Sequence, residues 1–93
     1  MSEETDKYIK FFKALANEDR IAIIKLLKQN EEMAAQNVEK HFYLEQSTTS
    51  HHLNTLKRAG ITKSRKTGRN ILYSINYETF DETLNAFAKD MLN

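Results

Sequence analysis

Residues 46–77 read QSTTSHHLNTLKRAGITKSRKTGRNILYSINY, and the organisation of the whole chain can be worked out from this stretch. It contains six basic residues and no aspartate or glutamate, whereas the segments before and after it each carry more acidic than basic residues. The net charge of +1 therefore conceals one concentrated cationic segment. A segment rich in basic, hydroxyl and amide side chains is typical of a surface that meets a polyanion.

The first part of this acid-free stretch predicts a helix. Gln46 or Ser47 is expected to cap its N-terminus, and the helix is expected to run to Ala59 and stop at Gly60. A short helix over 34–42 and a brief turn without glycine precede it. A short helix, a short turn and a second helix are the layout of a helix-turn-helix.

After Gly60 the apolar pattern changes from the helical period to the period of two that is typical of strands. Ile71, Tyr73 and Ile75 alternate with Leu72 and Ser74, which predicts a strand, and a first strand is expected near 62–66. Thr67-Gly68-Arg69-Asn70 supplies the turn between them. A hairpin that follows a helix-turn-helix is a wing.

The flanking segments predict amphipathic helices. Residues 5–16 place apolar and aromatic side chains on one face, and Asn17 is a candidate cap for a second helix whose apolar positions are spread widely enough for a central place in the core. A terminal helix carries a further apolar stripe. These two end helices suggest a dimer interface built from Tyr8, Phe11, Phe12, Phe80, Leu84, Phe87 and Met91, although closing the core of a single chain is the alternative role for the same side chains.

The expected recognition helix can be divided by helical angle. If Thr49, Leu53 and Leu56 face the core, the polar residues on the other side can reach DNA. We expect the residues nearest the helix start to read bases: Gln46, Ser47, Thr48, Ser50 and His51. We expect the basic residues to contact phosphates or, on the wing, the minor groove: Lys57, Arg58, Lys63, Arg65, Lys66 and Arg69.

Composition limits the remaining possibilities. Ninety-three residues make one domain, expected over 1–93, and the fold class is mainly α with a small β-hairpin, in the order α-α-α-α-β-β-α. The chain has no cysteine and no apolar run of the roughly 20 residues that a membrane span requires, which predicts a cytoplasmic protein without membrane contact. We expect no catalytic residues and no cofactor, because no carboxylate pair or nucleophile-base pair has usable spacing.

None of the three histidines suggests a metal site. His51 and His52 are adjacent, so on a helix they point in different directions; His51 is expected to face out and His52 to be partly buried with its hydrogen bonds satisfied. His41 has no obvious partner. We therefore predict no metal.

Two blocks of sequence are similar to the ArsR/SmtB family of winged-helix repressors. LANEDRIAIIKLL resembles the family's second helix, and QSTTSHHLNTLKRAGI followed by KSRKTGRNILYSI resembles its recognition helix and wing. The similarity covers about residues 8–77. It implies a homodimer that packs through its first and last helices, binds an operator and is released by an effector, often a metal ion.

The departures from the family pattern bear on the effector. Where metal-sensing members carry a Cys-x-Cys pair, this chain has Ala34 and Gln36, and the counterparts of ligands on the last helix are Tyr77, Thr79, Asp90 and Asn93. Any effector would therefore be an unknown small molecule, and the alternative is a protein that senses nothing and acts through its own concentration. Thr49 stands where the family usually buries an aliphatic residue, and we expect its hydroxyl to bond the carbonyl one turn back.

The leading hypothesis is a homodimeric repressor that binds a pseudo-palindromic site in double-stranded DNA. The alternative is a winged helix that acts as a protein-interaction module, with the basic face docking an acidic partner.

Overall fold

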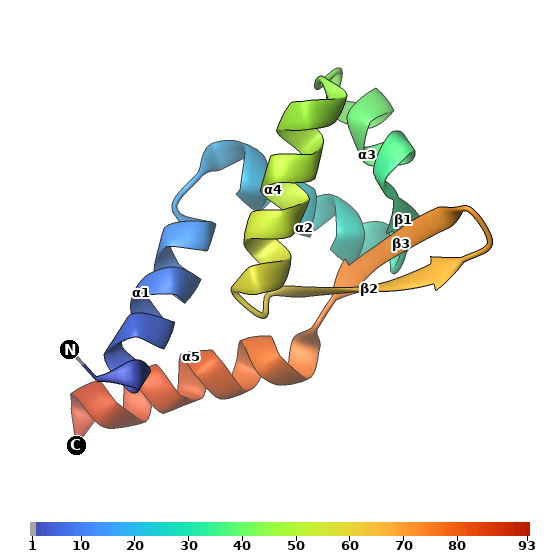
Figure 1. The fold of residues 1–93 in the computed structure, drawn as a ribbon. Helices are drawn as coiled ribbons and strands as arrows, with labels where there is room; N and C mark the ends of the chain where they lie inside the picture. Colours follow the sequence, from blue (N-terminus) through green and yellow to red (C-terminus); the bar gives the residue numbers. More distant parts are fainter. Residues whose placement is uncertain (1) are drawn as a thin grey trace.

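The computed structural model describes residues 2–93, with the elements coloured along the chain in Figure 1. In order, they are α1 (Glu3–Leu15), α2 (Glu18–Asn30), β1 (Met33–Ala34), α3 (Ala35–Phe42), α4 (Gln46–Arg58), β2 (Thr62–Thr67), β3 (Asn70–Ile75) and α5 (Tyr77–Leu92). The predicted winged helix-turn-helix and its mainly helical class are confirmed: α3 and α4 form the helix-turn-helix, and β2 and β3 form the wing.

Side-chain caps determine where three of the helices begin. The side chains of Ser2, Asn17 and Asn76 accept hydrogen bonds from backbone amides three residues later, at the starts of α1, α2 and α5. Each satisfies one of the amides that a helix leaves unpaired at its first turn. The predicted cap at Asn17 is confirmed.

The core lies between the helices and one face of the sheet. It is formed by Phe11, Ala14, Ile23, Leu27, Val38, Leu53, Leu56, Ile61, Tyr73 and Ile75. The buried positions of α2 fit its predicted central place, since Ile23, Leu26 and Leu27 are all buried.

The sheet has three strands rather than the two that were predicted. β1 pairs antiparallel with β3, through Met33 with Tyr73 and Ala34 with Leu72, so the strand order is β1-β3-β2. The helix expected over 34–42 is corrected accordingly, with Ala34 in β1 and α3 beginning at Ala35. A strand of two residues has no alternation to detect, and it forms because the free edge of β3 offers backbone hydrogen bonds.

Gly60 ends α4 in a conformation that few other residues would tolerate. Its φ is +77°, and a Cβ at this position would lie 2.7 Å from Cγ2 of Thr79 in α5. The glycine therefore both reverses the chain after α4 and allows α5 to approach closely.

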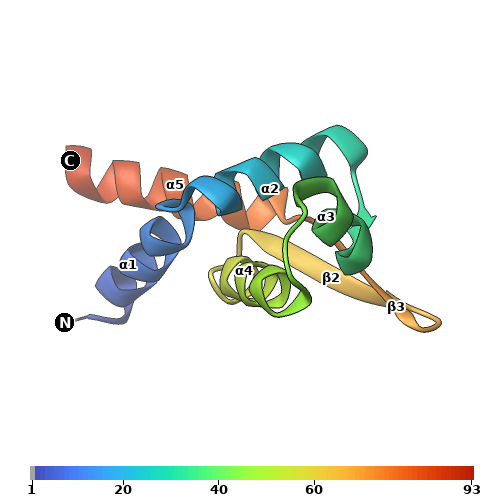
Figure 2. The same cartoon turned by 90° about the horizontal axis from the view of Figure 1, so that it is seen from above.

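The end helices pack against each other through aromatic edges. Ring centroids are 5.1 Å apart for Tyr8 and Phe87, 4.6 Å for Phe12 and Phe87, and 5.3 Å for Phe11 and Phe80. The molecule is elongated, at 44 × 22 × 22 Å. Figure 2 shows α4 on the side opposite α2 and α5, with the hairpin projecting from the end remote from the start of α1.

Candidate nucleic-acid interface

Helix α4 has one buried side and one free side. Thr49, His52, Leu53 and Leu56 are buried. Among the predicted base-reading residues, Gln46, Ser47, Ser50 and His51 are exposed and Thr48 is half-buried. The structure thus leaves the polar side of α4 accessible, as the helical spacing predicted.

The start of α4 differs from the prediction. Glu45, not Gln46 or Ser47, is the N-cap residue, and its side chain makes no capping hydrogen bond. Gln46 is already helical. The first amides of α4 therefore have no side-chain acceptor, and the positive end of the helix dipole faces outward, which suits a phosphate oxygen.

The expected hydrogen bond of the Thr49 hydroxyl is not formed. Thr49 is fully buried, and its Oγ1 has no hydrogen-bond partner among the described residues, 2–93. The carbonyl one turn back, on Glu45, accepts instead from the backbone amide of Thr49 at 3.0 Å.

The wing carries its basic residues on two faces. Thr62 and Ser64 lie opposite Ile75 and Tyr73, on the face that packs on the core, whereas the alternating Lys63 and Arg65 lie on the other face. The alternation places Lys66 on the same face as the core-packing residues, further toward the tip. All the basic side chains of the wing are exposed: Lys63, Arg65, Lys66 and Arg69.

Arg65 is paired within the chain. Its Nε and Nη2 donate to the two carboxylate oxygens of Glu32, at 2.7 and 2.8 Å, and its Nη1 donates to Thr67. These hydrogen bonds hold the pKa of Glu32 below its ordinary value and raise the pKa of Arg65. The stretch 46–77 has no acidic residue of its own, but the fold supplies one from the loop before β1.

Further basic residues join this surface from α1. Lys10 and Lys13 line a hollow of about 380 Å³ between α1 and α4, together with Arg20 and Arg58; Asp6 is its acidic neighbour. The predicted DNA-contacting residues did not include Lys10 and Lys13, although their spacing of three residues places them on one side of α1. Arg58, predicted as a phosphate contact, therefore lies beside two lysines from another helix.

The end helices present a partly covered apolar face. Tyr8 and Phe11 are buried within the single chain, at 5% and 1% exposure, so neither adds exposed surface to the predicted dimer interface. Leu84 and Met91 are 42% and 57% exposed, and Phe12, Phe80 and Phe87 are half-buried. A groove of about 440 Å³ lies between α1 and α5, lined by Thr5, Tyr8, Ile9, Phe12, Lys13, Ala16, Phe87 and Met91.

Histidine placement agrees with the predicted orientations: His51 is exposed, and His52 is buried with polar partners on α2. Within residues 2–93, no group of three or more His, Cys, Asp or Glu side chains is arranged to hold a metal ion. In the same range, no helix combines the length and apolarity needed to cross a bilayer.

A model of the bacterial regulatory proteins of the arsR family matches residues 17–64, which run from the cap of α2 into the wing. The chain belongs to the arsR family. It is a helix-turn-helix transcriptional regulator and not an enzyme.

Two relatives of this family member align over most of their length. A helix-turn-helix-type transcriptional regulator of Methanocaldococcus jannaschii is 42% identical over 66 residues, which cover 71% of this chain and 74% of the relative. The transcriptional repressor SdpR of Bacillus subtilis is 35% identical over 74 residues, covering 80% and 81%.

The solved structures agree with the fold. The homodimeric winged helix-turn-helix DNA-binding domain Mb0332 of Mycobacterium bovis superimposes with a TM-score of 0.76 at 27% identity, covering 96% of this chain and 84% of that domain.

Proposed function

We propose that this arsR-family regulator is a homodimeric repressor that binds a pseudo-palindromic operator in double-stranded DNA. The observation that carries the proposal is the exposed, uncapped and acid-free polar face of α4, with a cationic hairpin following it. The repressor SdpR and the homodimeric Mycobacterium bovis domain supply the precedents for repression and for dimerisation.

In this proposal the two parts of the surface have different roles. The short polar side chains at the start of α4 enter the major groove and read base edges: Gln46, Ser47, Thr48, Ser50 and His51. The basic residues bind the backbone: Lys57 and Arg58 at the end of α4, Lys63, Lys66 and Arg69 on the wing, and Lys10 and Lys13 on α1. The charge of Arg65 is partly neutralised by its bond to Glu32, so Arg65 contributes less to backbone binding than the other basic residues of the wing.

The proposed dimer interface is the uncovered part of the α1–α5 face. Leu84 and Met91 are its exposed centre, and Phe12, Phe80 and Phe87 form its half-buried floor. A second copy would cover this surface, and two-fold symmetry would place the two recognition helices about one DNA turn apart, roughly 34 Å.

The operator is tested by selecting bound sequences from a random duplex pool and then measuring the affinity of the selected duplex by fluorescence anisotropy. We expect a site with two inverted halves, and an affinity that falls steeply with salt because bound phosphates release counterions. A selected pool that stays random would contradict the proposal.

Dimerisation is tested separately, by light scattering across a concentration series. Met91→Glu places a charge in the proposed interface and should weaken dimerisation more than about tenfold, since burying an unpaired charge is costly. Asn85→Glu, at an exposed position on the same helix but outside the apolar stripe, is the matched control. Equal dimerisation of the two variants would exclude this face as the interface.

A further inference from the structure

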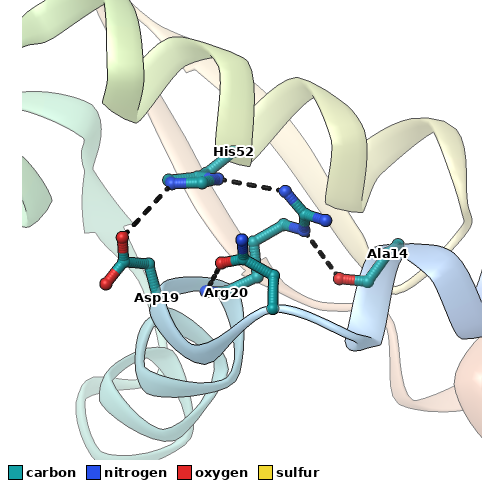
Figure 3. A network of polar contacts seen from close by, with 5 residues as sticks. Ala14, Asp19, Arg20 and His52 are labelled. Atoms are coloured by element: carbon teal, nitrogen blue, oxygen red, sulfur yellow. Dashed lines mark hydrogen bonds and ion pairs between the residues drawn. The ribbon is translucent and has the colours of Figure 1, made fainter.

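Arg20, in the first turn of α2, joins three helices. Its Nε donates to the carbonyl of Ala14 at 2.7 Å, its Nη2 donates to the carbonyl of Lys13 at 3.2 Å, and its Nη1 donates to Nδ1 of His52 at 3.2 Å. Figure 3 draws the contacts of Arg20 with Ala14 and His52, and the contact of His52 with Asp19. Both carbonyls belong to the last turn of α1, where a helix has unpaired acceptors and the negative end of its dipole.

The same contacts determine the protonation state of His52. A guanidinium can only donate, so Nδ1 must accept and the ring proton must lie on Nε2. Nε2 lies 3.7 Å from Oδ2 of Asp19, which favours the proton on that side. His52 is 7% exposed, so these two neighbours replace most of its contact with water.

The contact between Arg20 and His52 also connects α4 to the rest of the fold by a side-chain hydrogen bond. Within residues 2–93, the Arg20–His52 contact is the side-chain hydrogen bond that connects α4 to another helix. The apolar side chains of α4 fill the core, but apolar packing alone specifies direction weakly. The bond from His52 of α4 to Arg20, which in turn binds the end of α1, specifies it more sharply, because hydrogen bonds weaken steeply with angle.

We propose that Arg20 and His52 are positioning residues, which set the orientation of α4 relative to the α1–α5 pair and so determine the spacing of the two operator half-sites. The inference rests on the proposed function, since half-site spacing has meaning only for a dimer on DNA. Neither residue needs to touch DNA. Arg20 binds the end of α1, and its bond to His52 fixes where α4 lies relative to that end.

The proposed positioning contact requires a neutral His52. A protonated ring has no lone pair at Nδ1 and would face the Arg20 guanidinium as a second cation. The charged groups around His52 are Arg20 and Asp19 of α2 and His51 of α4, while α1 contributes its carbonyls through Arg20. Burial and, after it, Arg20 lower the pKa of His52 below its ordinary value, against the opposing effect of Asp19.

The sign of the pH effect follows. Because the folded protein favours neutral His52, the stability from this group is fully present above the ordinary histidine pKa of about 6.5 and is lost as the pH falls through the lowered pKa. Operator binding should weaken over the same range. A variant that retains His51 but lacks the titrating ring at position 52 assigns the effect to His52.

The test uses three variants: His52→Leu removes the acceptor, Arg20→Gln removes the bridge, and His52→Asn keeps an oxygen near the position of Nδ1 without a titrating ring. Their affinities are measured by anisotropy for the duplex selected with wild-type protein and for duplexes with one base pair inserted or removed between the half-sites. Loss of a hydrogen bond to a charged group predicts about a tenfold loss on the selected duplex for His52→Leu and Arg20→Gln. The altered spacings should be affected much less.

A role in stability alone gives a different result. A lower folded fraction would reduce the apparent affinity for every duplex by the same factor, whatever the spacing of its half-sites. That outcome would overturn the proposal. His52→Asn should retain the spacing preference and should lose less affinity than wild type between about pH 7.5 and about pH 5.5. Coincident pH profiles of wild type and His52→Asn would also overturn it.

Failure of the proposed function is recognised separately. If wild-type protein selects no duplex, the repressor proposal fails, and the contact is then tested without DNA by nitrogen-detected NMR of the His52 ring. An unprotonated Nδ1 that shifts on Arg20→Gln supports the contact. A proton on Nδ1 in wild type refutes it.

Discussion

Helix α4 and the wing come from one acid-free stretch, yet the fold holds them in different ways. α4 is held by a buried side made of Thr49, His52, Leu53 and Leu56, whereas the wing is buried only near its base. Within residues 2–93, no acidic residue is paired to the polar side of α4, but Arg65 of the wing is bound by Glu32. Two segments that share a charge pattern therefore need not have the same role. Residues elsewhere in the chain decide which side chains are buried against the core and which basic groups are paired with an acid.

The largest expected difference concerns stability. Leu53→Ala should lower the free energy of unfolding by about 2–5 kcal/mol, because Leu53 is fully buried and the lost atoms leave a cavity. Ile71→Ala on the wing should cost less than about 1 kcal/mol, since Ile71 is 46% exposed. Urea denaturation followed by circular dichroism measures both. Equal losses would show that the wing is anchored as firmly as α4.

The two glycines allow the same comparison of stability, since Gly60 follows α4 and Gly68 lies in the turn of the wing. Gly60→Ala should destabilise by about 2–3 kcal/mol, because alanine at φ +77° is strained and its Cβ would meet Thr79. Gly68→Ala, at φ +58° with open space around it, should cost only about 1 kcal/mol. Thermal unfolding of both variants provides the comparison. A larger loss at Gly68 would mean that the wing turn matters more to the fold than the close approach of α5.

Substitutions in α4 and in the wing should have different kinds of effect on DNA binding: the first should change the preferred sequence, and the second should weaken binding to all sequences. His51→Ala should change which base pair is preferred at one position of each half-site, with discrimination reduced by about 1–3 kcal/mol. Lys66→Gln should weaken binding to all sequences similarly and reduce the slope of log affinity against log salt by about one. Repeating the selection and a salt titration with each variant checks both. A changed sequence preference for Lys66→Gln would mean that the wing also reads bases.

The smallest expected effect tests the pairing of Arg65. Glu32→Gln removes the negative charge beside the wing and should raise DNA affinity by about two- to fivefold at low salt. Because the pKa of Glu32 is lowered, the pair is intact above the ordinary glutamate pKa and is lost only as the pH falls through the lower value. Anisotropy at low salt and neutral pH measures the change. A fall in affinity would instead indicate that orienting the wing matters more than its charge.

Sequence reasoning succeeded where the signal was local. The cap at Asn17, the end of α4 at Gly60 and the exposed polar side of α4 each depend on residues within a few positions of one another. The hairpin was also predictable, since its alternation and its glycine turn lie within fourteen residues of chain. These features fix the fold class and indicate the surface.

Two errors were local, at the cap of α4 and at the Thr49 hydroxyl, and the others concern contacts between distant segments. β1 exists only because β3 offers an edge, and the aromatic residues Tyr8 and Phe11 are covered by other parts of the same chain rather than available to a partner. The helical pattern showed that these residues are apolar on one face. It could not show what lies against that face.

The sequence by itself determined the helices, the hairpin and the one cationic stretch, because periodicity, capping and charge are carried by neighbouring residues. The tertiary structure alone decided that Glu32 binds Arg65 across 33 positions and that Arg20 meets His52 across 32. Such pairs depend on how separate elements are placed in space, and a side chain's partner at that range is set by packing and not by spacing along the chain.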